Sequence, residues 1–284
     1  MIEINELAFS YKKKKPLFNH LNLQLSSGRI HGLLGKNGAG KTTLLKLISG
    51  LLFPNNGNIK TLGYDPSKRK PGMLQDIYFL FEEFTLPDFS IQKFKEIYAG
   101  FYPNFDEKQF NAYLNEFEIH YNEKLNSLSY GQKKKILISF GLATNTKLLI
   151  MDEPTNGLDI PSKSQFRKIM AGAIDDNKCV IISTHQVRDL DNLIDSITIL
   201  DQQDIILSEA IENITAKLCF KALSQNEIEE HILYSESSLK GNWAVVENLH
   251  NEESKLDIEM LFNATFANKT KMHNLFKNIN TKQI

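Results

Sequence analysis

The sequence predicts an α/β fold with a mostly parallel sheet, an antiparallel β subdomain, an inserted helical subdomain and a small C-terminal α+β appendage. Short apolar runs at residues 30–34, 148–151 and 180–182 are bounded by Gly, Asp or Ser, as is typical of buried parallel strands. Helical patterns lie between these runs, and strands that alternate with helices indicate an α/β sheet. Residues 84–140 break the alternation with mainly helical patterns, which indicates the inserted subdomain.

The first elements along the chain are strands. Residues 2–9 and 17–25 alternate roughly between apolar and polar side chains, so we expect a hairpin whose tip, the lysines at 12–15, is solvated. A helix is predicted later in the chain, because from Phe166 the apolar residues recur at i+3, i+4, i+7 and i+8. Pro161 lies near the start of that helix, where its missing N–H has no cost.

The end of the chain has a different pattern. Three short strand-like stretches surround Phe220, Tyr234 and residues 243–246, and a polar segment rich in Lys and Asn follows them. We therefore predict two domains. The first covers residues 1–215, with the helical subdomain at about 84–140, and an accessory domain covers residues 216–284.

Composition and charge narrow the function classes. Of the 284 residues, 42% are hydrophobic and 24% charged, which is enough apolar material for a core and unlike a disordered chain. The longest apolar run, residues 77–81, is far shorter than the roughly 20 residues that cross a bilayer. The two cysteines and the lack of a signal-like segment lead us to expect a cytoplasmic location. The net charge of −1 disfavours nucleic acid as a partner.

Aromatic residues are concentrated in one segment. Half of the 28 aromatic side chains fall between Tyr78 and Tyr121. One interpretation is a small subdomain that fills a thin core with large side chains. The other is a docking surface for another protein, and the pattern alone leaves both open.

A glycine-rich motif carries the strongest chemical signal. Residues 35–42 fit the pattern G-x-x-x-x-G-K-[ST], and they follow the predicted strand at 30–34 and precede an apolar helix at 44–52. Glycines let successive N–H groups turn inward as an anion site at the start of a helix. Lys41 can neutralise the outer phosphates of a nucleotide, and the Thr42 hydroxyl can ligate Mg²⁺.

Polar residues follow two other predicted strands and open a helix. Asp152 and Glu153 end the strand at 148–151, and with a phosphate loop the first suits a hydrated Mg²⁺ and the second an attacking water. Without that loop, these acids would equally suit a capped strand end. Ser129 is a good N-cap for the helix that follows, and His185 follows the strand at 180–183. Both are also common structural residues.

Taken in order, these motifs resemble the ATP-binding subunits of ABC transporters over roughly residues 2–215. The matching segments are the phosphate loop at 35–43, the signature-like residues 128–132, the strand at 148–153, the turn at 157–159, and Ser183, Thr184 and His185. Residues 256–262 resemble the C-terminal appendage of exporters of the ABC-2 type. The resemblance implies a P-loop NTPase core, ATP hydrolysis, and ATP and Mg²⁺ as ligands.

The resemblance also implies site roles and partners. It implies that a head-to-tail dimer, here a homodimer, sandwiches ATP, and that a permease in the membrane is the partner. Glu153 would be the general base, His185 would contact the γ-phosphate and Tyr11 would stack on the adenine, while Thr42 and Asp152 would hold Mg²⁺. The phosphates would be held by Gly35, Asn37, Gly38, Ala39, Gly40, Lys41, Thr42 and Thr43. The partner's nucleotide would be reached by Ser129, Gly131, Gln132 and Asp159.

Two residues depart from the family pattern. Glu82 stands where the family commonly has a glutamine near the metal, so we expect it as a further, carboxylate ligand of Mg²⁺. Tyr130 stands where the signature usually has its first glycine. Because Ser129 and Gly131 remain, we expect the ATP sandwich to survive.

Three functional hypotheses follow. The leading one is an ATPase subunit that powers a membrane exporter from the cytoplasmic face of the membrane, through a permease. The alternative is a soluble ABC-type ATPase that acts on nucleic acid or ribosomes; such proteins commonly carry two ATP units or a long coiled-coil insertion, and neither pattern is present in this sequence. In a third, the segment from about residue 216 is a ligand-sensing regulatory domain.

Overall fold

The centre of the protein is a six-stranded sheet. The computed structural model describes residues 1–12, 15–121, 123–223, 231–238 and 241–277. All neighbouring strands of the sheet are parallel except the last pair, which is antiparallel. The strand order is β5 (Ile77–Leu80), β6 (Leu148–Asp152), β7 (Cys179–Thr184), β3 (Arg29–Gly35), β8 (Ser196–Asp201) and β9 (Asp204–Ala210).

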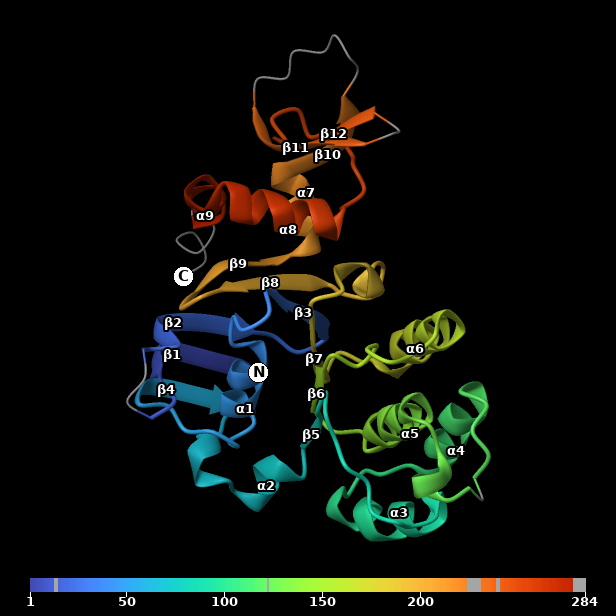
Figure 1. The fold of residues 1–284 in the computed structure, drawn as a ribbon. Coiled ribbons are helices and arrows are strands. Elements are labelled where there is room, and N and C mark those ends of the chain that lie inside the picture. Colours follow the sequence, from blue (N-terminus) through green and yellow to red (C-terminus); the bar gives the residue numbers. More distant parts are fainter. Residues whose placement is uncertain (13–14, 122, 224–230, 239–240, 278–284) are drawn as a thin grey trace.

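A second, antiparallel sheet packs on one side of the first (Figure 1). Its order is β2 (Phe18–Leu25), β1 (Ile2–Phe9) and β4 (Asn56–Thr61), and it shares a buried core with α1 (Lys41–Ile48). The predicted hairpin between β1 and β2 is present, but its tip at residues 13–14 lies outside the described residues. Helix α1 ends at Ile48, before the predicted residue 52, because Gly50 has a positive φ of 73° that ends the helix.

The helices within residues 84–173 lie on the other side of the central sheet (Figure 1). Within residues 84–143 they are α3 (Ile91–Tyr98), η2 (Ala99–Phe101), α4 (Glu107–Glu116), η3 (Leu125–Ser127) and α5 (Tyr130–Ala143), and α6 (Ile160–Ala173) follows them. The short η1 (Pro66–Lys68) and α2 (Pro71–Leu74) precede β5, and η4 (Val187–Leu190) follows β7. Helix α6 matches the sequence prediction and buries Phe166, Ile169 and Met170.

The aromatic segment contributes both a core and exposed rings. Phe140 lies at the centre of the helical subdomain, with ring centroids 5.1–6.0 Å from those of Tyr78, Phe94, Tyr102, Phe105 and Phe110. In contrast, Phe101 is 66% exposed and Tyr98 is 37% exposed. Most of these rings therefore fill a core, and a smaller set is available for contact with another protein.

The C-terminal segment forms a sheet and a helical layer. The connecting helix is α7 (Ile211–Lys217), and the sheet order is β10 (Leu218–Leu223), β12 (Gly241–Glu247) and β11 (Ile232–Ser238). The helices α8 (Ile258–Ala267) and α9 (Lys269–Lys277) lie between this sheet and β9 (Figure 1). Buried residues of α8, such as Leu261, belong to the same hydrophobic cluster as Ile197 of β8.

Helix α8 also contacts residues 1–215, the part of the chain that carries the motifs. Glu259 of α8 accepts a hydrogen bond from Nε of Arg188 at 2.8 Å and lies 2.7 Å from its Nη2. The Lys36 ammonium lies 4.4 Å from the centre of the Phe266 ring. Lys269, the first residue of α9, forms an ion pair with Asp201. The C-terminal segment therefore contacts the phosphate loop and the segment after His185.

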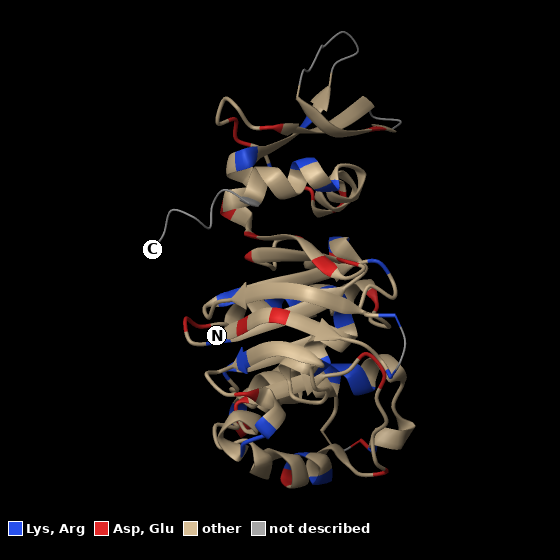
Figure 2. Ribbon diagram, turned by 90° about the vertical axis from the view of Figure 1, so that its left-hand side faces the viewer, with Lys and Arg blue, Asp and Glu red and all other residues tan. Residues whose placement is uncertain are grey.

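The distribution of charged residues and the lengths of the helices agree with the sequence analysis. In the view of Figure 2, Lys and Arg residues are interspersed with Asp and Glu residues along the ribbon, which fits the net charge of −1. Within the described part of the chain, every helix is too short or too polar to cross a membrane.

Candidate functional site

The candidate site is a cavity of about 470 Å³ at the carboxyl ends of β3, β6 and β7. Ligands bind at this edge of a parallel α/β sheet, because loops and helix starts converge there. Most of the residues predicted to bind ATP or Mg²⁺ line it. The lining residues are Tyr11, Leu17, Asn37, Gly38, Gly40, Lys41, Thr42, Thr43, Glu82, Asp152, Glu153 and His185.

The phosphate loop connects β3 to α1 and depends on two glycines with left-handed backbones. Gly38 has φ 79° and Gly40 has φ 105°, values that other residues adopt at a cost. A Cβ at Gly40 would lie 2.8 Å from the Phe18 ring, so only glycine fits there without a shift. Gly40 is the N-cap of α1 and offers no side-chain acceptor. The first N–H groups of α1 are therefore available to an anion.

Lys41, the first residue of α1, places an ammonium group at the floor of the cavity. Its Nζ donates a hydrogen bond to the Gly35 carbonyl at 2.9 Å, and the side chain is buried. Burial lowers the pKa of Lys41, while Glu153, Asp152 and Glu82 act in the opposite direction. A desolvated cation held beside a helix start is suited to bind phosphate.

Asp152 ends β6 and is held by two hydroxyl groups. Thr42 Oγ1 donates to its Oδ2 at 2.6 Å, and the Ser183 hydroxyl donates to its other oxygen. The Thr42 and Asp152 oxygens are adjacent hard ligands of the kind that Mg²⁺ prefers. Among the described residues, no group of three or more His, Cys, Asp or Glu is placed to hold a metal. The pair of Thr42 and Asp152 fits Mg²⁺, because this ion keeps several waters and takes few protein ligands.

Glu153 is the most constrained carboxylate of the cavity. One oxygen accepts from Thr184 Oγ1 at 2.9 Å, and the other accepts from the His185 N–H at 2.9 Å and from His185 Nδ1 at 2.7 Å. Its backbone has φ 48°, in the left-handed region, and its N–H donates to the Ser183 carbonyl at 3.0 Å. A non-glycine residue in this region indicates a strained position, which is common at functional sites.

Tyr11 and Glu82 lie at the borders of the cavity. Tyr11 is 45% exposed, its hydroxyl lies 2.9 Å from Thr43 Oγ1, and its ring packs edge-on against Phe9. The partly exposed ring can accept a flat ligand. Glu82 Oε1 accepts a hydrogen bond from Asn156 Nδ2 at 3.1 Å. The Glu82 carboxylate is therefore tied to the turn that follows Glu153.

The signature residues do not reach the cavity of their own subunit. Ser129 is the N-cap of α5 and forms a capping box with Gln132, with bonds of 3.2 and 2.9 Å. Gly131 packs so close to the Gly157 carbonyl that an added Cβ would lie 2.9 Å from its oxygen. Asp159 caps α6 by accepting from the Ser162 N–H at 2.9 Å. These four predicted ligands, Ser129, Gly131, Gln132 and Asp159, thus have local structural partners.

Three side chains around the site were assigned no chemical role in the sequence analysis. Ser183 and Thr184 end β7 and hold the two carboxylates that end β6. The signal in the sequence that could have indicated this role is the pair of adjacent hydroxyl residues at the end of a predicted strand. Lys134 is fully buried beneath Glu153, and the run of three lysines at 133–135 gave no indication of which one faces inward.

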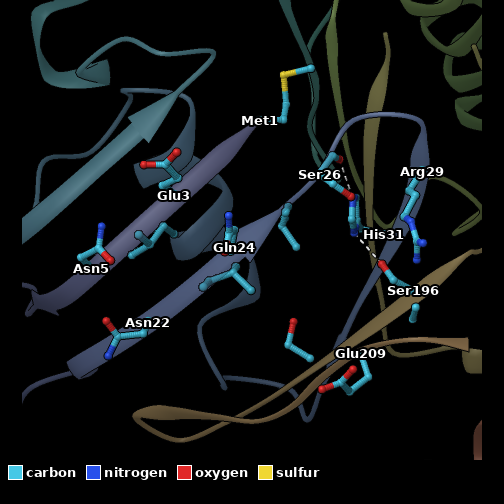
Figure 3. A pocket seen from close by; sticks show the side chains of 15 residues that line it. Met1, Glu3, Asn5, Asn22, Gln24, Ser26, Arg29, His31, Ser196 and Glu209 are labelled. Carbon is cyan, nitrogen blue, oxygen red and sulfur yellow. Dashed lines mark hydrogen bonds between the residues drawn. The ribbon is translucent and has the colours of Figure 1, made fainter. Parts of the chain in front are cut away.

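A second cavity, of about 700 Å³, lies away from these residues, between the antiparallel sheet and β8 with β9 (Figure 3). Its lining includes Glu3, Asn22, Arg29, His31 and Glu209. The His31 ring bonds to the Ser26 carbonyl through Nε2 and to the Ser196 hydroxyl through Nδ1. Burial lowers the pKa of His31, so the ring is a neutral structural group. This cavity contains none of the residues predicted to bind ATP.

Comparisons with known proteins agree with the motifs. A family model described as "ABC transporter" matches residues 18–156. The lantibiotic transport ATP-binding protein SrtF of Streptococcus pyogenes is 30% identical over 74% of this chain and 90% of its own. The SkfA peptide export ATP-binding protein SkfE of Bacillus subtilis (strain 168) is 31% identical over 66% of this chain and 80% of its own.

One solved structure supports the fold. The dimeric structure of MJ0796, a bacterial ABC transporter cassette, has a TM-score of 0.64 to this chain at 22% identity, over 74% of this chain and 99% of that one. This likeness confirms the predicted α/β fold of the core.

Proposed function

This chain belongs to the ABC transporter family as an ATP-binding subunit, and on that premise we propose how its residues bind and hydrolyse ATP to power an exporter. The observation that carries the proposal is the position of Glu153. Its carboxylate is fixed by three hydrogen bonds and lines the same cavity as the phosphate loop, Lys41 and the Thr42–Asp152 pair. A carboxylate fixed beside a phosphate site is suited to hydrolysis.

The phosphate loop and its neighbours bind the nucleotide. Lys41 and the N–H groups at the start of α1 hold the phosphates together with the loop at residues 35–43, and Tyr11 stacks on the adenine at the exposed border of the cavity. Thr42 and Asp152 would hold Mg²⁺, with Glu82 as a further candidate, and the ion would neutralise charge on the phosphate oxygens. Binding places the γ-phosphate next to Glu153.

Glu153 acts as the general base. It accepts a hydrogen bond from a water molecule and directs the water oxygen to the γ-phosphorus. The bond between that phosphorus and the bridging oxygen breaks, which yields ADP and inorganic phosphate, and the proton of the water moves toward Glu153. Thr184 and His185 hold the carboxylate for this step.

His185 contacts the γ-phosphate. Because an ionised carboxylate only accepts hydrogen bonds, Nδ1 of His185 carries the proton in its 2.7 Å contact with Glu153. The other ring nitrogen, Nε2, is then the atom left to contact the γ-phosphate.

A second copy of the chain completes the site. Ser129, Gly131 and Gln132 do not line the cavity of their own subunit, so in a head-to-tail homodimer they bind the nucleotide of the partner. Asp159 connects the two sites across the interface. Closure of this dimer on ATP supplies the mechanical step, and hydrolysis releases it.

The dimer acts on a permease at the cytoplasmic face of the membrane. The names of the relatives SrtF and SkfE refer to lantibiotic transport and peptide export, which favours an exporter over an ATPase that acts on nucleic acid. Exposed rings of the helical subdomain, Phe101 and Tyr98, are candidates for the permease contact. We assign residues 1–215 to the ATPase domain and residues 216–284 to an accessory domain, whose helix α8 packs against the first domain.

Two substitutions test the catalytic roles. Lys41→Ala should abolish ATP binding, since it removes the cation that faces the phosphates. Glu153→Gln should keep ATP binding and lose turnover, and it should trap a dimer in the presence of ATP. Equilibrium binding, phosphate release and size-exclusion chromatography measure these outcomes. Turnover by Glu153→Gln at the parental rate would contradict the general-base role.

A third measurement tests the membrane partner. Glu153→Gln, expressed in its native host and trapped with ATP, should co-purify from solubilised membranes with an integral membrane protein. Lys41→Ala is the matched control, because it should not form the ATP dimer. Stimulation of ATPase by RNA or DNA, with no membrane protein recovered, would favour the nucleic-acid alternative.

A further inference from the structure

Lys134 is a charged side chain that is 0% exposed, one turn into α5. Lysines are almost never fully buried unless they are paired, because removal of an ammonium group from water is costly. The ammonium of Lys134 donates to two backbone oxygens, the carbonyl of Glu153 at 2.9 Å and the carbonyl of Asn156 at 2.9 Å. Both oxygens belong to the turn that follows β6.

The turn held by Lys134 contains the general base. The Asn156 N–H also donates to the Glu153 carbonyl, at 3.2 Å, which closes the turn. At the end of this turn, the side-chain amide of Asn156 donates a hydrogen bond to the Glu82 carboxylate. Lys134 thus connects the signature helix α5 to a turn that carries Glu153 and contacts Glu82.

Tyr130, the residue that replaces a signature glycine, covers Lys134. The Lys134 ammonium lies 5.1 Å from the centre of the Tyr130 ring. That ring stacks on Phe84 at 5.0 Å and 16°, and its hydroxyl donates to the Glu82 carbonyl. A ring face in this position stabilises the cation and excludes water. The departure from the family pattern and the buried lysine therefore form one unit.

The surroundings of Lys134 keep it cationic despite its burial. Burial lowers the pKa of Lys134 to about 8, and the nearby carboxylates of Glu82, Glu153 and Asp152 oppose that effect. The side chain therefore carries its charge at neutral pH. A charged donor forms stronger hydrogen bonds to carbonyl oxygens than a neutral one.

We propose that Lys134 is a positioning residue for ATP hydrolysis, which holds the Glu153 carbonyl and thereby the strained backbone that aims the Glu153 carboxylate into the cavity. Glu153 has φ 48°, a conformation that persists only where its surroundings enforce it. The two bonds from Lys134 are such a constraint. The inference rests on the proposed function, since it assigns Lys134 to the action of the same base.

The experiment compares three variants of the full-length chain. Lys134→Met keeps the length and removes the donor, Lys134→Gln keeps a neutral donor, and Lys133→Met makes the same change at a half-exposed neighbour. Steady-state ATPase assays give kcat and KM for each. We expect kcat of Lys134→Met to fall about 10- to 100-fold with KM within about threefold, since small displacements of a catalytic group have effects of this size. The kcat of Lys134→Gln should lie between that of Lys134→Met and that of the parent. The kcat and KM of Lys133→Met should match those of the parent.

Several outcomes would overturn the inference. These are parental kcat in Lys134→Met, an equal loss in Lys133→Met, or a rise in KM as large as the fall in kcat, which would indicate a general disturbance of the fold. If Lys134→Met does not fold, Lys134→Gln decides: a lowered kcat at parental KM supports the role, and parental kcat or lost ATP binding refutes it. A parent chain without ATPase activity would refute the proposed function itself, whereas an active parent that is indifferent to Lys134 refutes only this inference.

Discussion

The substitution Thr184→Val tests whether the hydrogen bonds around Glu153 aim its carboxylate. Thr184 is buried at the end of β7, and its hydroxyl donates to Glu153 Oε2 at 2.9 Å. Valine has nearly the same shape and lacks the donor. A hydrogen bond to a charged group contributes about 1.5–3 kcal/mol. If that contribution acts fully on the transition state, kcat should fall about 10- to 150-fold.

The assay measures kcat and KM for ATP by phosphate release, together with thermal unfolding by circular dichroism. Thr184→Ser is the rescue variant, because it keeps the hydroxyl, and it should stay within a few-fold of the parent. Thr198→Val is the matched control: Thr198 is a buried threonine on β8 whose hydroxyl lies 3.0 Å from that of Ser208, away from the site. Unchanged kcat in Thr184→Val, or an equal loss in Thr198→Val, would refute the argument that this bond matters for catalysis.

Three further predictions address other parts of the molecule. Phe140→Ala removes the ring at the centre of the helical subdomain and should lower the free energy of unfolding by about 3–5 kcal/mol in a denaturant titration; a loss below about 1 kcal/mol would show that the site collapses. Lys134 has a folded-state pKa of about 8, below that of an unfolded lysine, so the unfolded state binds more protons between about pH 8 and 10.5. The free energy of unfolding of the parent should therefore rise across this window relative to Lys134→Met, by up to about 3 kcal/mol, and a flat difference would contradict the lowered pKa. Tyr11→Ala should weaken ATP binding while Tyr11→Phe, which keeps the ring and loses only the contact with Thr43, should not; equal losses would indicate that the hydroxyl, not stacking, matters.

The sequence predicted the elements whose patterns are local. Apolar runs or repeats with clear limits mark the parallel strands at 29–35, 148–152 and 179–184 and helix α6. Their existence and approximate bounds could therefore be predicted from the order of apolar residues along the chain. The phosphate loop was equally clear because its glycines, Lys41 and Thr42 are adjacent in the chain. The structure contains these strands and this helix, and the loop connects β3 to α1.

Other features depend on contacts between distant residues. The bonds from Thr184 and His185 to Glu153 exist only because β6 and β7 are neighbours in the sheet. The burial of Lys134, rather than Lys133 or Lys135, depends on how α5 packs against the turn after β6. Gly50 itself is a local stop signal for α1, but its approach to Pro66, where an added Cβ would lie 2.3 Å from the carbonyl oxygen, depends on the fold. None of these contacts has a signature in a short window of sequence.

The contacts of α8 bear on how this chain can be recombined with its relatives. Glu259 forms an ion pair with Arg188, and the Phe266 ring packs against Lys36. One helix of the C-terminal segment therefore contacts two residues of the segment 1–215. A chimera that takes its C-terminal segment from another transporter would need matching partners at positions 36 and 188. Modular exchange at residue 215 would separate side chains that belong to one interface.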